Sequence, residues 1–153
     1  MAIDQPNGSA VFPIAEVLDR DWGQEVILVA TEFYTLKHIV MNPGSCGGLQ
    51  YHHKKDESGI ARAGWATVEY DKGDGKLVKK TLLAGECFRF PQGAVHRVTA
   101  GRVGFEYYEV STPHLNDRCH CEKDYGLEEE TGGLPSTNPE DVVTIPKGAG
   151  LAR

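Results

Sequence analysis

The sequence contains no hydrophobic run long enough to cross a bilayer, and its start, MAIDQPNGSA, lacks the basic and apolar regions of a signal peptide. A membrane-spanning helix needs about 20 consecutive apolar residues. A secretory leader needs an apolar stretch that follows a basic one. We therefore expect a cytoplasmic protein that has no membrane partner.

Basic residues are in deficit, since 16 Lys and Arg stand against 22 Asp and Glu and leave a formal net charge of −6. Such a surface repels phosphate backbones, so we expect no nucleic-acid partner. The four cysteines show no CxxC spacing, and we expect them to be reduced thiols. Cys119 and Cys121 flank His120, but on an extended segment the thiols and the imidazole point to opposite faces, which argues against a metal site there.

Helical periodicity is almost absent, and the one candidate is a short helical turn at 14–20. The chain is instead made of short runs rich in β-branched and aromatic residues, separated by Gly, Pro, Asp or Asn. These runs predict strands at 25–31, 33–41, 48–54, 60–71, 76–83, 87–91, 95–100 and 103–111, with a hairpin turn at 71–76. The pattern is typical of a single all-β domain, a sandwich or a barrel.

The two ends of the chain differ from its middle. From Gly126 onward the sequence is acidic, rich in Gly, Pro, Ser and Thr, and poor in aromatics, which predicts irregular structure. We therefore expect an N-terminal extension at 1–23, a β-barrel at 24–112 and a C-terminal extension at 113–153. The C-terminal extension is expected to pack back on the barrel or on a partner subunit.

Two short motifs carry the chemistry of the chain. In the first, Gln50 and His52 are two apart and share one face of an extended strand. Glu57 follows His52 after four intervening residues, and Gly64 follows after six more. The second motif, about forty residues further on, consists of Gly85, Pro91, Gly93 and His96.

These spacings resemble the two motifs of the cupin family, with Gln50 at the position of the first histidine and Ala100 in place of the final Asn. The resemblance implies a double-stranded β-helix, or jelly-roll barrel, that binds one divalent metal ion through Gln50, His52, Glu57 and His96. A mixed nitrogen and oxygen ligand set suits Mn, Fe, Co, Ni or Zn. The alternative is that the pattern serves folding alone, with both histidines as hydrogen-bonded core residues.

Flanking residues narrow the resemblance to the cupin domains of type II phosphomannose isomerases and related sugar-nucleotide enzymes. The shared features are the Trp22–Gly23 pair, a Gln-x-His-x4-Glu motif and the segment EKDYG at 122–126. His120 stands where those relatives usually have Arg. The resemblance therefore implies sugar chemistry, but it does not imply mannose 6-phosphate as the particular substrate.

The function implied is a metal-dependent isomerase or epimerase that acts on a small molecule, a sugar or sugar phosphate. Glu57 is the candidate base if it is loosely coordinated, and Lys55 would bind an anionic substrate group at the mouth of the pocket. Other candidates for binding or polarising substrate oxygens are Tyr51, Arg62, Arg89 and Tyr107. Two alternatives remain open: a mononuclear iron oxygenase, and a non-catalytic sugar- or metabolite-binding cupin. We expect a homodimer.

The remaining polar residues near the motifs receive lesser roles. Glu57 is preferred over Asp56 as the acidic ligand because of its spacing to Gly64. His53 should face away from the metal if the strand alternates. Surface or supporting positions, not metal binding, are expected for His38, His114 and His120, because none has a partner at a chelating spacing. Lys54 and Lys55 are expected on a solvated rim.

Overall fold

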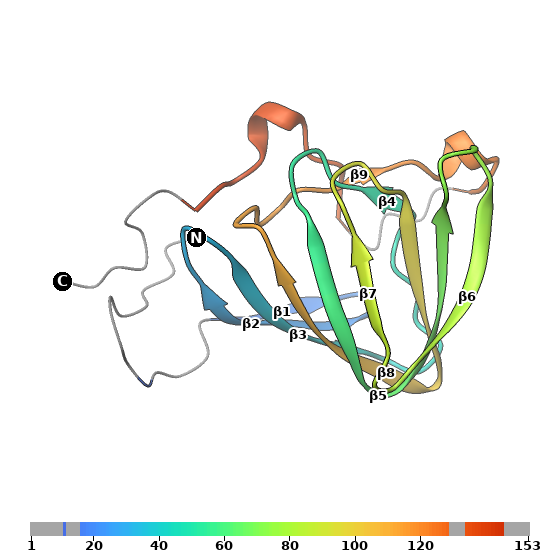
Figure 1. Cartoon of the computed structure of the whole chain (residues 1–153), viewed down its shortest axis with the longest axis horizontal. Coiled ribbons are helices and arrows are strands. Elements are labelled where there is room, and N and C mark those ends of the chain that lie inside the picture. The colour runs from blue at the N-terminus through green and yellow to red at the C-terminus, as the bar shows by residue number, and fades with distance from the viewer. Residues whose placement is uncertain (1–10, 12–15, 129–133, 146–153) are drawn as a thin grey trace.

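The computed structural model describes residue 11, residues 16–128 and residues 134–145, and it confirms the all-β prediction (Figure 1). Nine strands and two short 3₁₀ helices form in the described part of the chain. In chain order these are β1 (Glu16–Arg20), β2 (Gly23–Ala30), β3 (Thr35–Met41), β4 (Gln50–Tyr51), β5 (Glu57–Asp71), β6 (Leu77–Leu83), β7 (Cys87–Phe90), β8 (His96–Ser111), β9 (Cys119–His120), η1 (Glu122–Tyr125) and η2 (Pro139–Asp141). No helix among the described residues is long and apolar enough to span a membrane.

The strands pair antiparallel in a single curled sheet (Figure 1). One path through the sheet runs β1-β2-β3-β8-β4-β9, and β5 pairs with β6, β7 and β8. The long strands β5 and β8 lie side by side over most of their length, and irregularities near Ala61–Ala63 and Gly64–Ala66 interrupt their register. Such irregularities bend strands and increase their twist, so one pair of long strands serves both halves of the barrel.

The strand at 16–20 corrects the prediction of a helical turn at 14–20. Residues Glu16 to Arg20 pair with β2 in an unbroken antiparallel register, from Glu16 opposite Ile27 to Arg20 opposite Gly23. A short segment with few apolar residues has weak local preference, so pairing with a neighbouring strand decides its conformation. Residues 14 and 15, like the rest of the expected extension before Glu16 apart from residue 11, lie outside the described residues.

Two other details of the strand prediction changed. The predicted strand at 48–54 is only the two-residue strand β4 (Gln50–Tyr51). The predicted strands at 95–100 and 103–111 are one strand, β8, which passes through Gly101 and Gly104 without a break. The predicted hairpin turn at 71–76 is confirmed, and Asp71 Oδ1 accepts hydrogen bonds there from the backbone N–H groups of Gly73, Asp74 and Gly75. An aspartate that binds the following amides in this way favours a turn over continued strand.

Gly64, the last residue of the first motif, lies where the backbones of β5 and β8 approach each other closely. Its φ is +73°, and a Cβ atom there would lie 2.1 Å from the carbonyl oxygen of Gly104. Both the positive φ and the close backbone approach exclude a side chain at this position. The motif glycine therefore has a structural role in the bend of the barrel.

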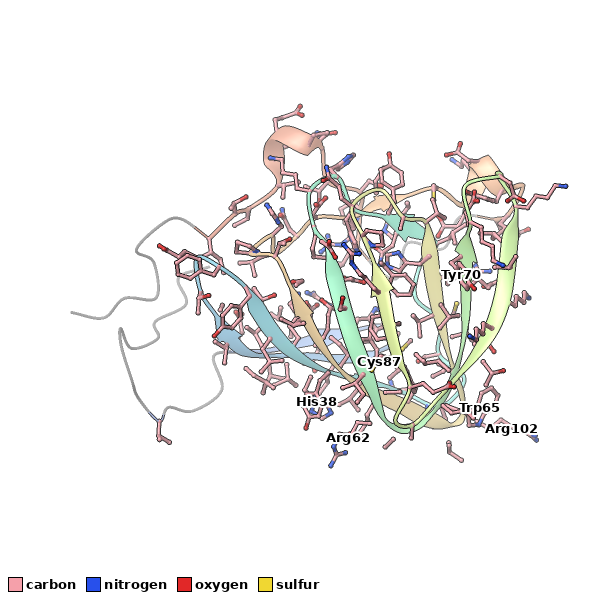
Figure 2. All side chains as sticks on the ribbon, viewed as in Figure 1. His38, Arg62, Trp65, Tyr70, Cys87 and Arg102 are labelled. Carbon is pink, nitrogen blue, oxygen red and sulfur yellow. The ribbon has the colours of Figure 1, made fainter. Side chains whose placement is uncertain are left out.

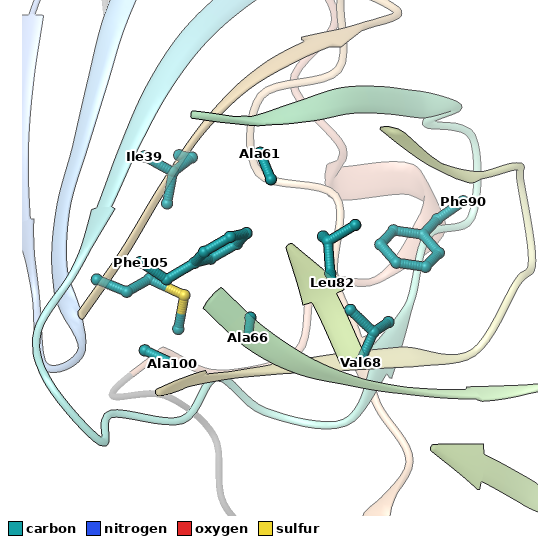
Figure 3. Close-up of a cluster of buried hydrophobic side chains, with 9 residues drawn as sticks. Ile39, Ala61, Ala66, Val68, Leu82, Phe90, Ala100 and Phe105 are labelled. Atoms are coloured by element: carbon teal, nitrogen blue, oxygen red, sulfur yellow. The ribbon is translucent and has the colours of Figure 1, made fainter. Parts of the chain in front are cut away.

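The barrel interior is filled by an apolar cluster (Figure 3). Its buried members are Ile39, Met41, Ala61, Ala66, Val68, Leu82, Phe90, Ala100 and Phe105. They come from β3, β5, β6, β7 and β8, so burial of this cluster ties the two halves of the sheet together. A solid apolar filling leaves room for polar chemistry only where the cluster ends.

Part of the chain beyond the barrel packs back on it, as expected for the C-terminal extension. Strand β9 pairs with β4, and Thr144 forms an isolated bridge with His114. Ile145 is buried in a second apolar cluster with Ile27 and Ala30. Residues 129–133 and 146–153 of the expected tail lie outside the described residues.

Candidate metal centre

Three candidate metal ligands meet at one end of the barrel. His52 follows β4, Glu57 is the first residue of β5 and His96 is the first residue of β8. One ligand atom from each lies within 4.8 Å of the other two. The Nε2 atoms of His52 and His96 are 3.3 Å and 3.2 Å from the two carboxylate oxygens of Glu57. All three residues are buried, at 2%, 6% and 3% exposure in chain order.

The hydrogen bonds of the two imidazoles leave their inner nitrogens free to bind a cation. Nδ1 of His52 donates to the backbone carbonyl of Asp117, and Nδ1 of His96 donates to that of Ala94 at 2.9 Å. These bonds place the proton of a neutral ring on Nδ1 and leave the Nε2 lone pair facing Glu57. Burial lowers the pKa of His52 to about 4, outweighing the opposing effect of Glu57.

Two lone pairs that face a carboxylate call for a positive charge between them. His52 Nε2 is a buried atom without a hydrogen-bond partner, as expected of a metal-binding nitrogen. A backbone carbonyl that holds the opposite ring nitrogen is the usual support of a metal-binding histidine. The residues present therefore fit a divalent metal ion, and His52, Glu57 and His96 form a candidate three-residue site.

Gln50 lies next to this cluster. It is opposite His96 in the register of β4 and β8, and its side chain lines the same cavity as the three ligands. Asp56, the alternative acidic ligand, instead forms a surface ion pair with Arg89 at 2.6 Å. The alternation that separates neighbouring residues on an extended chain thus assigns Glu57, and not Asp56, to the interior.

Asp117 holds the loop that carries His52 and leads to Glu57, and the sequence analysis did not identify it. Its side chain accepts hydrogen bonds from three successive backbone N–H groups, those of His53 at 2.9 Å, Lys54 at 2.6 Å and Lys55 at 2.8 Å. Its own carbonyl binds His52. Although burial by itself would raise the pKa of Asp117, these three amides lower it.

The candidate metal ligands line a cavity of about 130 Å³ that is mostly polar in its chemistry. Its wall includes three aromatic side chains, Trp22, Phe90 and Tyr107, and many charged ones. The charged lining residues are Arg20, Glu25, Lys37, Lys55, Glu57, Arg97, Glu109, Asp117 and Arg118. A cavity of this kind offers hydrogen bonds to a small polyhydroxy compound, and its apolar side chains can pack against the carbon skeleton of that compound.

Lys55 is buried, which corrects its placement on a solvated rim. Its exposure is 8%, and its Nζ lies 2.5 Å from Glu57 Oε2 and 3.6 Å from Glu109 Oε1. Burial would lower the pKa of Lys55, but the charges of Glu109 and Glu57 raise it. Glu57 is also buried, which would raise its pKa, and the neighbouring Lys55 and His52 lower it well below its usual range. Lys55 is therefore a fixed positive charge beside the candidate metal site.

A second group of charges lies further along the cavity wall. Glu25 Oε1 is 2.6 Å from Lys37 Nζ, and Glu25 Oε2 is 3.0 Å from Arg20. Burial would raise the pKa of Glu25, but Lys37 and Arg20 lower it to about 2.

Burial raises the pKa of Tyr107 well above its ordinary value. Tyr107 is thus a neutral hydroxyl at neutral pH.

The candidate substrate-binding residues are divided between the cavity and the outside. Lys55 and Tyr107 line the cavity, whereas Tyr51, Arg62 and Arg89 are not among its lining residues. Figure 2 shows Arg62 at the end of the barrel opposite β4 and β9, where it pairs with Glu106. Arg89 lines a separate cleft formed by residues of β5, β6, β7 and the turn before β8. Neither arginine is placed to bind a substrate at the candidate metal centre.

The other histidines also differ in position. His53 points away from the three ligands, as expected, and its Nε2 donates to the carbonyl of Thr137 at 3.1 Å. His38 pairs with Glu106 on the outer side of the sheet. His120 is not at the surface, since its side chain is 4% exposed and lines the cavity opposite Gln50. His96, Gln50 and His120 thus form a row across β8, β4 and β9.

Comparison with known proteins places this geometry in a family. The profile of the family described as Mannose-6-phosphate isomerase C-terminal matches residues 10–117. The mannose-1-phosphate guanylyltransferase of Escherichia coli K12 is 34% identical over 92 residues. That alignment covers 60% of this chain but only 18% of the relative, so the chain corresponds to a small part of the length of that protein.

Solved structures show the same fold at low sequence identity. KdgF from Halomonas sp. matches with a TM-score of 0.57 and 20% identity over 64% of this chain and 87% of that one. An RmlC-like cupin from Shewanella frigidimarina matches with a TM-score of 0.55 and 21% identity over 64% of this chain and 83% of that one. The expected cupin jelly-roll fold is therefore confirmed.

Proposed function

The chain belongs to the mannose-6-phosphate isomerase C-terminal family, and on this premise we propose that it is a metal-dependent isomerase or epimerase of sugars or sugar phosphates. The observation that carries the proposal is the candidate site of two histidines and one glutamate, which opens onto a small polar cavity. A structural metal site is closed by protein ligands, whereas a catalytic one keeps a position for substrate. The three ligands here would need only Gln50, substrate or water to complete a four-coordinate set.

In this proposal His52, Glu57 and His96 hold the metal ion, and Gln50 is the fourth ligand. When bound, the ion supplies a Lewis acid that polarises the substrate carbonyl. Lys55 orients Glu57 and offsets its charge, and Trp22 and Tyr107 form the wall against which a sugar ring or open-chain sugar packs. Glu57 acts as a ligand and not as the base, because both of its oxygens are already engaged by His52, His96 and Lys55.

Positive side chains near the cavity support an acidic sugar as substrate. Arg20, Lys37 and Arg118 all line the wall. Within the described residues, Glu25 is the carboxylate that pairs with both Arg20 and Lys37. Glu25, Glu109 and Asp117 in the same wall balance the charge of these three cations, so a phosphate or carboxylate group would be held by direct hydrogen bonds from Arg20, Lys37 and Arg118 and not by excess positive charge. In this proposal they bind the anionic group that the relatives would bind with an arginine at the position of His120.

The test is an isomerisation assay on protein loaded separately with Mn, Co, Ni or Zn. Mannose 6-phosphate and its neutral counterpart mannose are each incubated with the protein, and aldose and ketose are followed by NMR. We expect turnover that disappears in His96→Ala. A loss of preference for the phosphorylated sugar in Arg118→Gln would support the anionic subsite. No turnover with either sugar and any of these metals would refute these sugars as substrates.

One observation favours a second candidate function, an iron-dependent oxygenase. Two histidines and one carboxylate with open positions are the ligand set of many mononuclear non-haem iron enzymes. The discriminating measurement is oxygen consumption by the iron-loaded protein in the presence of a candidate organic substrate. Binding of sugar without turnover or oxygen uptake would instead identify a non-catalytic binding cupin.

We also propose that the protein is a homodimer. Exposed apolar side chains on the outer side of the sheet, including Ile60, Trp65 and Val110, support this assembly. Isolated exposed apolar residues are common, but several on one curved sheet favour association. Light scattering should give twice the mass of the chain, and a monomeric mass at micromolar concentration would contradict the proposal.

A further inference from the structure

Glu109 is a buried carboxylate in the cavity wall to which the metal site gives no role. It lies on β8, is 6% exposed and lines the cavity. Its Oε1 atom has no hydrogen-bond partner, although it is fully enclosed. A buried charged group without a hydrogen bond is costly and rare in folded proteins. The position therefore calls for a ligand or a chemical role.

The cations that face Glu109 are each held more closely by another carboxylate. Lys55 Nζ is 2.5 Å from Glu57 but 3.6 Å from Glu109. Lys37 is opposite Glu109 in the register of β3 and β8, yet its Nζ binds Glu25 at 2.6 Å. Both lysines thus stabilise a negative charge near Glu109 without occupying its Oε1. That oxygen is left to a substrate atom in the cavity.

The surroundings also suit proton transfer. The titratable groups that act on Glu109 are Lys55, Glu57 from β5, Lys37 from β3 and Glu25 from β2. Burial and the charge of Glu57 raise the pKa of Glu109, while the two lysines lower it. A carboxylate with a raised pKa is a stronger base than an exposed one. Tyr107, two residues earlier on β8, remains a hydrogen-bond donor.

We propose that Glu109 is the catalytic residue that moves the proton between adjacent carbons of the sugar. This inference rests on the proposed isomerase function and goes beyond it by separating the base from the ligand Glu57. In the first step, the C2–H bond breaks and its proton passes to the Glu109 carboxylate. The electron pair forms the C1–C2 double bond as the C1 carbonyl becomes an enediolate oxygen.

The second step reverses the first at the neighbouring carbon. Glu109 returns its proton to C1, and a C1–H bond forms. The C2 hydroxyl loses its proton to the oxygen on C1, so that C2 becomes the carbonyl carbon. No oxidant or reductant is consumed, and aldose and ketose differ only in the positions of two protons and one double bond. A proton held on Glu109 between the steps exchanges with solvent whenever the cavity is open.

The experiment follows isomerisation and deuterium incorporation by NMR in D2O for the wild type, Glu109→Gln, Glu109→Asp and the control Glu106→Gln, each assayed for bound metal. Glu106 is on the same strand but pairs with His38 and Arg62 on the outer side. We expect Glu109→Gln to keep its metal, lose about 100-fold or more in kcat with little change in KM, and lose the acid limb of the pH profile. Glu109→Asp should recover part of the rate, and Glu106→Gln should match the wild type.

The outcomes separate the two proposals. A wild type without turnover refutes the isomerase function and, with it, the role of Glu109. An active wild type with Glu109→Gln active to within about threefold refutes the role of Glu109 alone, since a lost general base costs about 100-fold or more. Isomerisation without deuterium incorporation in any variant indicates a direct hydride shift and also overturns the proposal, as does loss of metal from Glu109→Gln.

Discussion

The loop between β4 and β5 depends on Asp117, and removal of its side-chain charge is a sharp test of how the metal centre is built. In Asp117→Asn the side chain keeps one oxygen but replaces the other with an NH2 group. Either the N–H group of His53, which binds Oδ1, or the N–H groups of Lys54 and Lys55, which share Oδ2, would then face a donor. The variant should therefore fold less stably and position His52 less well.

The magnitude follows from the hydrogen bonds that are lost. A hydrogen bond to a charged group contributes about 1.5 to 3 kcal/mol, and an unsatisfied buried donor costs about 1 to 3 kcal/mol. Since the remaining amide oxygen recovers part of this, we expect a loss of about 2 to 4 kcal/mol in the free energy of unfolding. For a domain of this size the melting temperature should fall by about 4 to 16 °C. Weaker support of a metal ligand should also reduce metal affinity by about 10-fold to 100-fold.

The assay is urea denaturation of the metal-free protein, together with titration of the metal into wild type and Asp117→Asn. The matched control is Asp74→Asn, because Asp74 accepts a single hydrogen bond, from Lys76, in an exposed turn. We expect the control to change stability by less than about 0.5 kcal/mol. An Asp117→Asn variant as stable as the control, with unchanged metal affinity, would refute the role assigned to Asp117.

Three further predictions test the fold and its charges. The pKa of Glu25 is lowered to about 2 from an ordinary 4.5, so its ionised form stabilises the fold above pH 4.5, and this contribution, up to about 3 kcal/mol, is lost as the pH falls toward 2. Urea denaturation at pH 5 and pH 3 should therefore show a smaller change in stability with pH for Lys37→Met than for the wild type. An equal change in the two proteins would contradict the ion pair. Gly64→Ala should lower the free energy of unfolding by about 2 kcal/mol or more. The control Gly75→Ala, with a similar φ of +75° but open space around it, should cost only about 1 kcal/mol. If thermal denaturation gave the two variants similar losses of stability, the close approach of β5 and β8 would be contradicted. Ile145→Ala should cost about 2 to 4 kcal/mol because it empties a buried position, and a loss below about 0.5 kcal/mol would contradict packing of the C-terminal segment on β2.

Local sequence pattern was sufficient for most of the barrel, because strands and turns have short-range signals. The aspartate at 71 with its glycines predicts the hairpin, and the β-branched runs predict the strands. The segment at 16–20 was mispredicted because its conformation is decided by pairing with β2, which local sequence does not report. Its alternating half-buried and exposed pattern appears only once that pairing is known.

The candidate site was partly predictable for the same reason. His52, Glu57 and His96 belong to spaced motifs, and the structure brings them together. The sequence does contain a signal for Glu109. It follows Phe105 and Tyr107 at every second position of a strand, so its side chain is on the same inward face as theirs. For Asp117 the sequence contains no such signal, since its hydrogen-bond partners lie more than sixty positions earlier in the chain. Contacts of that range depend on the whole fold and not on a motif.

The central claim is that His52, Glu57 and His96 bind a divalent metal ion, and metal content tests it most directly. Protein purified without chelator or nickel affinity would be analysed by mass spectrometry as wild type, His52→Ala, His96→Ala and the control His53→Ala, whose side chain points away from the site. We expect about one Mn, Fe, Co, Ni or Zn ion per chain in the wild type and control, and less than about a tenth of that in the other two. No metal in the wild type after reconstitution, or equal metal in all four proteins, would contradict the claim.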